Sequence, residues 1–301
     1  MKPSLWRIKA KAGRFFGQGG QLIRRAWALF VADGPAVLAL GLVLMALPGI
    51  LKTWLMGDVA TMNVEALLSG LMNGRYVGMN STPGWLLEIA TAILFVPAMY
   101  GCLSLLFSGR WEGSPRSLVS ALQTVRIKLG KVVLSGLCVY LACSLLDILP
   151  SLANSILGLV QMLVGWIPVV GVLTGALIYL ILFLIQTAID LLNQVVMVFA
   201  MMALLGEGLW GKPLVMRAAS MLWGGRTDGL PALGFMLLIW FVAGLLGQGI
   251  NVAMLSMGAS LISASVVTGI LDALGSCFSA AMAAVLYLSE RDRVEGIHVS
   301  A

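Results

Sequence analysis

Charged residues are scarce in this sequence of 301 residues, and hydrophobic residues dominate it. Asp, Glu, Lys and Arg together make up 11% of the chain, whereas hydrophobic types make up 60%. The mean hydropathy is +0.99. A soluble domain of this length cannot hide so much apolar surface. The composition therefore excludes a soluble globular domain and indicates a protein of the lipid bilayer.

Histidine and cysteine are also rare, which removes several kinds of reactive site. The one histidine, His298, lies in the C-terminal tail, so a histidine-based triad or a multi-histidine metal site within the apolar region is excluded. Cys102, Cys138, Cys143 and Cys277 lack paired metal-type spacing and are expected to be reduced packing residues. No glycine-rich loop ends in Lys-Ser or Lys-Thr, which argues against a nucleotide-driven motor. We expect no enzyme, no cofactor and no metal site.

Six apolar stretches are long enough to cross the bilayer as helices. A spanning helix needs roughly 20 predominantly apolar residues, and these runs are continuous, whereas the strands of a barrel would alternate. We therefore predict an all-α transmembrane bundle over residues 35–290, preceded by a basic amphipathic segment at 1–34 and followed by a short cytoplasmic tail at 291–301. The predicted spans are 35–56, 85–107, 132–149, 175–205, 231–250 and 262–288.

Basic residues gather in alternate connections between these spans. They precede the first span and follow the second, the fourth and the sixth, so the positive-inside rule assigns these segments to the cytoplasm. The remaining connections hold Asp58, Glu65 and Arg75, or no charge. We expect a multi-pass protein of a bacterial inner membrane with both termini cytoplasmic. The net charge of +6 then reflects topology and anionic headgroups, and it does not indicate nucleic acid.

The interval 132–205 allows two interpretations. It holds either two spans and an outer helix near 155–166, or four spans with turns at Pro150, Pro168 and Asp190. Four spans would have only about 17 residues each, the shortest workable length. We favour two, with Pro168 opening a long fourth helix.

A short amphipathic cytoplasmic helix is expected before each outward-going span, and the three candidates share one spacing. Leu22, Leu118 and Leu214 lie 96 residues apart, and Gly34 and Gly130 each follow 12 residues later. A glycine at such a position can end a helix and turn the chain. The spacing suggests three parallel repeats about an axis near the membrane normal. The alternative is a coincidence between ordinary interfacial loops.

Polar residues inside the predicted spans are costly, with a penalty of about 2.5 to 3.5 kcal/mol for an Asp at a helix centre. Helical spacing puts those of the fourth span on one face, and the sixth span carries a similar stripe. Two such stripes should face one another or water, not lipid. The fourth-span residues are Gln186, Asp190, Asn193 and Gln194, and those of the sixth are Ser265, Thr268, Asp272, Ser276 and Ser279.

Asp190 and Asp272 have two main interpretations. Protonated or hydrogen-bonded acids can hold helices together in a membrane, whereas intramembrane acids are by default candidates for a ligand site or a pathway. Glu88, Asp147 and Lys52 lie nearer the outer surface, where interfacial exposure or pairing is expected. The predicted spans thus hold four acids and one base. This surplus of acidic residues favours either protonated carboxyls or a cavity that accepts cations or protons. Intramembrane aspartyl proteolysis is a further formal alternative.

The C-terminal boundary reads Tyr287, Arg291, Arg293 and Glu295-Gly296. It resembles the end of the last helix in bacterial membrane proteins related to the membrane domain of glycerophosphoryl diester phosphodiesterases. A Tyr-x-Asp-Leu-Arg-x-Arg-x-Glu-Gly pattern recurs there, and Ser289-Glu290 replaces its Asp-Leu in this chain.

Glu207-Gly208, followed by Ser220 and Arg226, is similar to the Glu-Gly and the serine-containing elbow of that family. The resemblance implies an α-helical membrane domain that is sometimes fused to a catalytic barrel. No barrel follows here, so phosphodiesterase activity is not expected. The candidate lipid-phosphate contacts or topology anchors are Arg291, Arg293, Arg217 and Arg126.

The sequence thus favours an integral inner-membrane protein without autonomous catalysis, serving as a scaffold, accessory or lipid-associated component. Its expected partners are membrane lipids and either other membrane proteins or further copies of itself. The alternative is a small transporter or channel that uses Asp190 and Asp272.

Overall fold

The computed structural model describes residues 3–55, 86, 87, 89–146, 148, 152, 153, 155, 156, 158, 159, 168–223 and 229–295. These residues form helices and connecting turns, with no strand among them. Three short segments, η1, η3 and η4, are π-helical turns. The elements are α1 (Pro3–Ala32), α2 (Gly34–Gly41), η1 (Leu42–Ala46), α3 (Leu47–Leu55), η3 (Thr91–Phe95), α6 (Val96–Trp111), α7 (Leu118–Ile127), α8 (Leu129–Leu146), α10 (Pro168–Met201), η4 (Met202–Gly206), α11 (Lys212–Trp223), α12 (Gly229–Ser256) and α13 (Leu261–Glu295).

Five helices in the described part of the chain are long and apolar enough to cross a membrane, which confirms the helical membrane class. They coincide with five of the predicted spans: Gly34–Leu55, Thr91–Trp111, Leu173–Gly206, Leu233–Ser256 and Ile262–Glu295. The stretch predicted as the third span overlaps α8, within which Leu129–Ala142 is a shorter apolar helix. The count of six stays a prediction.

The fourth span is a single long helix, as expected. α10 begins at Pro168 and continues without a break past Asp190 to Met201. Proline is suited to this first position because its missing N–H would have no partner within the helix there. The alternative with a turn at Asp190 is therefore wrong. The predicted outer helix at 155–166 falls largely outside the described residues.

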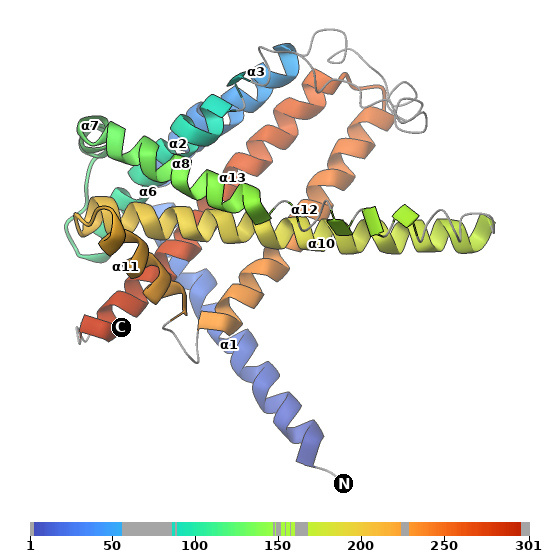
Figure 1. Ribbon diagram of the computed structural model, residues 1–301, viewed down its shortest axis with the longest axis horizontal. Coiled ribbons are helices and arrows are strands. Elements are labelled where there is room, and N and C mark those ends of the chain that lie inside the picture. Colours follow the sequence, from blue (N-terminus) through green and yellow to red (C-terminus); the bar gives the residue numbers. More distant parts are fainter. Residues whose placement is uncertain are drawn as a thin grey trace.

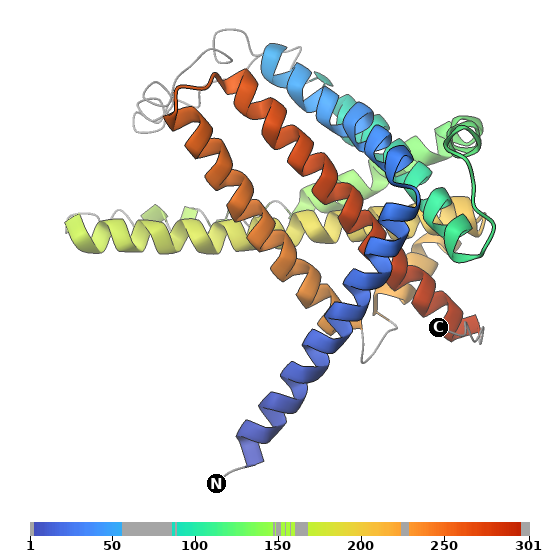
Figure 2. The same cartoon turned by 180° about the vertical axis from the view of Figure 1, so that it is seen from behind.

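The segment α2–η1–α3 and α12 lie on either side of α13, and α10 crosses α12 and α13 (Figures 1 and 2). α8 packs along α10, while α1 contacts α12 and α13 and then leads away from the bundle to the N-terminus. Gly41 permits the close approach of α2 to α13, since a Cβ there would lie 2.8 Å from Cys277 Sγ. Small residues at such contacts let spanning helices pack closely.

A core of buried residues lies where α6 meets the second halves of α10 and α13. Phe107, Met201 and Leu288 are fully buried there, and the rings of Phe199 and Tyr287 form an edge-to-face pair with centroids 5.2 Å apart. Four alanines of α13 line the contact and let the neighbouring helices approach: Ala280, Ala281, Ala283 and Ala284. Of the predicted packing cysteines, Cys102 and Cys277 are buried and Cys138 is exposed.

Short helices occupy two of the three predicted elbow positions, α7 and α11, whereas α1 is 30 residues long. Ser117 caps α7 by accepting a hydrogen bond from the Ser120 backbone N–H at 3.2 Å. The prediction that Gly34 and Gly130 end the elbow helices is wrong, because they lie in the first turns of α2 and α8. The chain bends just before them, at Asp33 and Lys128, whose negative φ angles need no glycine. The 96-residue repeat stays a prediction.

Candidate functional site: a polar cavity within the bundle

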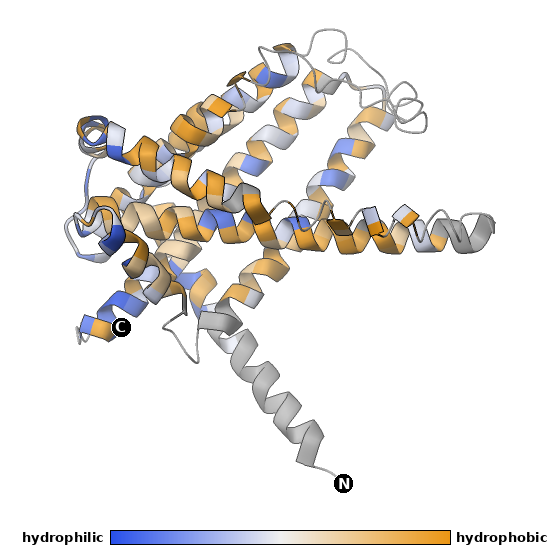
Figure 3. Cartoon of the chain, viewed as in Figure 1, coloured by the Kyte–Doolittle hydropathy of each residue, from blue (hydrophilic) through white to orange (hydrophobic). Residues whose placement is uncertain are grey.

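Polar positions interrupt α10 and α13, which are otherwise largely apolar (Figure 3). On α10, the Gln186 side-chain amide donates a hydrogen bond to Asp190 Oδ1 at 3.1 Å, one turn along the same helix. Asn193 and Gln194 continue this face by a further turn. The i, i+4 spacing read from the sequence therefore produces a continuous polar strip on α10.

The stripe on α13 divides into two parts. Ser265 and Thr268 donate their hydroxyls to carbonyl oxygens of their own helix, at 2.8 Å to Ile262 and 3.0 Å to Ala264. Ser276 and Ser279 are fully buried, and their hydroxyls have no hydrogen-bond partner among the described residues. The second part of the stripe therefore places hydroxyl groups that are not hydrogen-bonded within the described residues in the protein interior.

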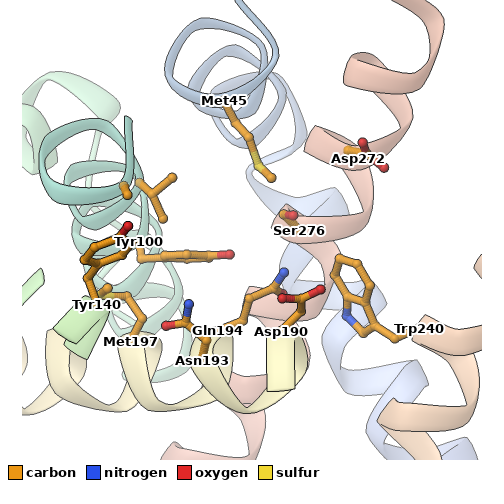
Figure 4. Close-up of a pocket in the computed structure, with 12 residues that line it drawn as sticks. Met45, Tyr100, Tyr140, Asp190, Asn193, Gln194, Met197, Trp240, Asp272 and Ser276 are labelled. Carbon is orange, nitrogen blue, oxygen red and sulfur yellow. The ribbon is translucent and has the colours of Figure 1, made fainter. Parts of the chain in front are cut away.

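The two polar faces meet at one cavity of about 420 Å³ (Figure 4). Its lining comes from η1, η3, α6, α8, α10, α12 and α13, so it lies where the described helices converge. It brings together five of the predicted site residues: Asp190, Asn193, Gln194, Asp272 and Ser276. The other lining residues are Met45, Ala92, Val96, Tyr100, Tyr140, Met197 and Trp240.

The cavity has an acidic and electron-rich lining. Its described residues include two carboxylic acids and no lysine, arginine or histidine. Among the described residues, Gln194 Oε1 and Ser276 Oγ are buried and have no hydrogen-bond partner, and the Tyr100 hydroxyl points into the same space (Figure 4). A bound cation or water would satisfy these oxygen atoms, because an unpaired buried polar group is costly.

The two acids lie at different heights in the cavity. Asp190 lies between Gln194 and Trp240, whereas Asp272 lies one helical turn from Ser276, with its carboxyl directed away from Asp190 (Figure 4). Both side chains are solvent-accessible in the isolated chain. This arrangement gives two separate carboxyl positions along one space, in contrast to a dyad that shares a proton.

Two π-helical turns border the cavity. η1 contributes Met45, and η3 contributes Ala92. A π turn adds one residue to the helical turn, is rare overall and occurs frequently at functional sites. The cavity is therefore built partly from helix irregularities that hydrophobic periodicity does not predict.

Other predicted site residues lie apart from this lining. Gln186 is hydrogen-bonded to the lining residue Asp190, and Thr268 is bonded to its own helix. Lys52 is half-buried in the last turn of α3. Asp147 and Glu88 fall outside the described residues.

Three aromatic residues of the cavity were missed from sequence: Tyr100, Tyr140 and Trp240. An aromatic residue in a span is ordinarily a packing residue or part of an interfacial belt. The one available signal was position, because Trp240 falls in the middle of its predicted span and not at a membrane interface.

The predicted phosphate-binding arginines are mostly ion-paired. Arg217 bonds to Glu207 at 2.8 Å and to Glu295 at 2.7 Å. Burial lowers the pKa of Arg217, but the hydrogen bonds and charges of its carboxylate partners outweigh burial and raise it. The remaining pairs are Arg291 with Glu112 at 2.8 Å and Arg293 with Glu290 at 2.5 Å. Arg126 is exposed on α7.

Comparisons of the chain with protein-family models, with curated proteins and with solved structures give no match. The resemblance at the C-terminal boundary therefore stays a prediction, and function has to be argued from the geometry.

Proposed function

We propose that this chain is a small transporter that binds cations in the cavity between Asp190 and Asp272. The observation that carries the proposal is the shared cavity: acids from two different helices line one space whose described lining holds no basic side chain. A carboxyl group inside a membrane is expensive unless it serves a ligand or a partner. Cations that enter this space would offset the charges of the two acids.

The preferred ligand class is a small organic ammonium. Trp240, Tyr100 and Tyr140 add aromatic faces to the carboxyls, and a cation over such a face gains about 0.5 to 2 kcal/mol. Met45 and Met197 supply polarizable thioethers. We propose binding and passage for this site, without a covalent step.

We place the transporter in a bacterial inner membrane, with six spans, α8 as the third, and both termini cytoplasmic. Ion pairs support this topology because they join segments that the positive-inside rule assigns to one side. Asp33, before the first span, pairs with Arg110 at the end of α6 at 2.5 Å. Glu112 pairs with Arg291 near the end of α13. In this topology α7 and α11 lie on the cytoplasmic membrane surface.

Charge movement in proteoliposomes tests the proposal. Full-length protein would be adsorbed on a solid-supported membrane and exposed to steps of methylammonium, tetramethylammonium, sodium or acid. We expect a saturable current with at least one of these cations, which Asp190→Asn and Asp272→Asn reduce at least about tenfold, since a lost charge contact is worth 1.5 to 3 kcal/mol. Glu290→Gln is the matched control, because Glu290 pairs with Arg293 away from the cavity.

Two results would contradict a transport role. The first is a wild-type protein that gives no current above empty liposomes with any of the four probes. The second is a current that both Asp variants keep at the level of Glu290→Gln.

A second candidate, the scaffold or accessory role, draws support from the exposed helices. Only 6% of the apolar stretch of α12 and 18% of that of α10 is buried. Lipid covers such faces in a monomer, and another membrane protein or a second copy covers them in a complex. Val242→Cys and Leu246→Cys on the exposed face of α12 would form crosslinks in native membranes under this second function, and would remain uncrosslinked if α12 faces lipid.

A further inference from the structure

An apolar groove lies between α8 and α11, on the surface of α10, and it is separate from the cation cavity. Its volume is about 460 Å³, and its walls are almost wholly aliphatic or aromatic. α8 contributes Leu134 and Val139, α10 contributes Phe199 and α11 contributes Leu214 and Val215 as lining residues. Leu134 and Val215 keep 46% and 63% of their surface exposed. Such a groove in a membrane protein suits a hydrocarbon chain.

Small residues make the room for this groove. Ala218 and Ala219 on α11, and Ala142 on α8, line it where larger side chains would close it. α8 and α11 both pack on α10, so α10 forms the floor and the two other helices form the walls. The width is therefore set by the alanines and by the packing of both walls on one helix.

One end of the groove carries a tryptophan and two lysines. Lys131 Nζ lies 5.7 Å from the centroid of the Trp210 ring, and Trp210 lines the groove. Lys131 precedes Leu134 and Ser135 by one turn of α8, and Lys212 follows the lining residue Gly211. Both lysines are exposed. Tryptophan and lysine are the residues that occupy the headgroup level of a membrane.

Two glycines with positive φ angles flank Trp210 at this end of the groove. Gly208 and Gly211 flank Trp210 with φ angles of 73° and 67°, in the left-handed region that side chains other than glycine adopt only with strain. These two turns bring Trp210 out of the line of α10 and set it against the start of α11. The indole therefore marks the boundary between the apolar groove and the charged rim.

We propose that this groove binds one anionic phospholipid, with an acyl chain along Leu134, Phe199 and Val215 and the phosphate between Lys131 and Lys212. The charge of the rim selects an anionic headgroup over a zwitterionic one, and the groove selects a chain-bearing lipid over free phosphate. The site is independent of the transport proposal, because none of its residues lines the cation cavity.

Native mass spectrometry of the full-length protein tests this site. Delipidated protein in detergent would be titrated with phosphatidylglycerol, with phosphatidylcholine of the same chains, and with inorganic phosphate. We expect one phosphatidylglycerol to bind more tightly than phosphatidylcholine, and Lys131→Gln and Lys212→Gln each to reduce that preference about fivefold. Arg24→Gln is the matched control, because it removes one exposed positive charge from α1.

A second variant separates chain binding from charge. Ala219→Phe fills the groove from an exposed position and is expected to lower the binding of both lipids while the thermal stability of the protein is unchanged. Equal affinity for the two lipids in the wild type, an effect of Arg24→Gln as large as that of Lys131→Gln, or a dimer that excludes lipid from the wild type would each overturn the proposal. Binding of inorganic phosphate as strong as that of the lipid would overturn it as well.

Discussion

Tyr287 donates a hydrogen bond to Glu207 Oε1 at 2.6 Å and so connects α13 to the residue that follows η4. Glu207 also accepts two bonds from Arg217, at 2.8 and 3.2 Å, and Arg217 reaches Glu295 at 2.7 Å. We call these four residues the end cluster. It joins the residue after η4 to α11 and α13 at one end of the bundle.

The end cluster should contribute measurably to stability. The side chains of Arg217 and Glu207 are only about one-fifth exposed, at 21% and 18%, so removal of one partner leaves the other charge poorly solvated. We expect Arg217→Gln to cost about 1 to 2 kcal/mol of unfolding free energy. Unfolding in SDS, followed by tryptophan fluorescence, would measure it. Arg24→Gln should have no effect, since Arg24 is exposed.

A double-mutant cycle separates the contact from the general loss of charge. Because the two groups bind each other, Arg217→Gln with Glu207→Gln should cost less than the sum of the single changes. Strict additivity of the two costs would mean that the contact contributes nothing to folding.

At Gly136, α8 packs closely against η3 and the start of α6. A Cβ added there would collide with the ring of Pro97 and lie 3.2 Å from the Ile93 carbonyl oxygen, and a proline ring cannot rotate out of the way. Gly136→Ala should therefore destabilise the protein by about 1 to 3 kcal/mol through overpacking. Gly249→Ala on α12 is the control, because nothing lies within 4 Å of its added Cβ. SDS unfolding of both variants tests this, and equal stability would contradict the close packing of α8 on α6.

Ser114 and Ser256 lie on opposite sides of the membrane in the proposed topology. Ser114 lies in the turn between α6 and α7, and Ser256 ends α12; both are exposed. In a background without the native cysteines, a membrane-impermeant maleimide should label Ser256→Cys in intact cells. It should label Ser114→Cys only in inverted vesicles. Labelling of both from one side would contradict the proposed arrangement.

Periodicity and charge predicted much of the architecture because both are local properties of a sequence. The unbroken helix from Pro168 and the polar face from Gln186 to Gln194 follow from spacing alone. The bends were misassigned to Gly34 and Gly130, because the chain turns one or two residues earlier with ordinary backbone angles.

The full lining of the cavity could not be predicted, because it depends on contacts between helices that are distant in the sequence. Trp240 and Tyr100 come from helices without a polar stripe, and Met45 belongs to a π-helical turn. The end cluster joins residues about 80 positions apart, as Tyr287 and Glu207 are. Sequence reasoning predicted that the stripes of α10 and α13 face one another or water, but it could not assign the aromatic lining or the partners within the end cluster, because those contacts depend on the packing of whole helices.

The most direct measurement of the central claim is an infrared difference spectrum of the reconstituted protein, recorded by attenuated total reflection as tetramethylammonium or methylammonium is washed in and out. If the cavity binds cations through its acids, the wild type will show a reversible change in carboxyl bands. Asp190→Asn and Asp272→Asn will each lose part of that change, while Glu290→Gln will keep it. A wild-type spectrum without carboxyl bands, or one that both Asp variants reproduce in full, would contradict a cation site at Asp190 and Asp272.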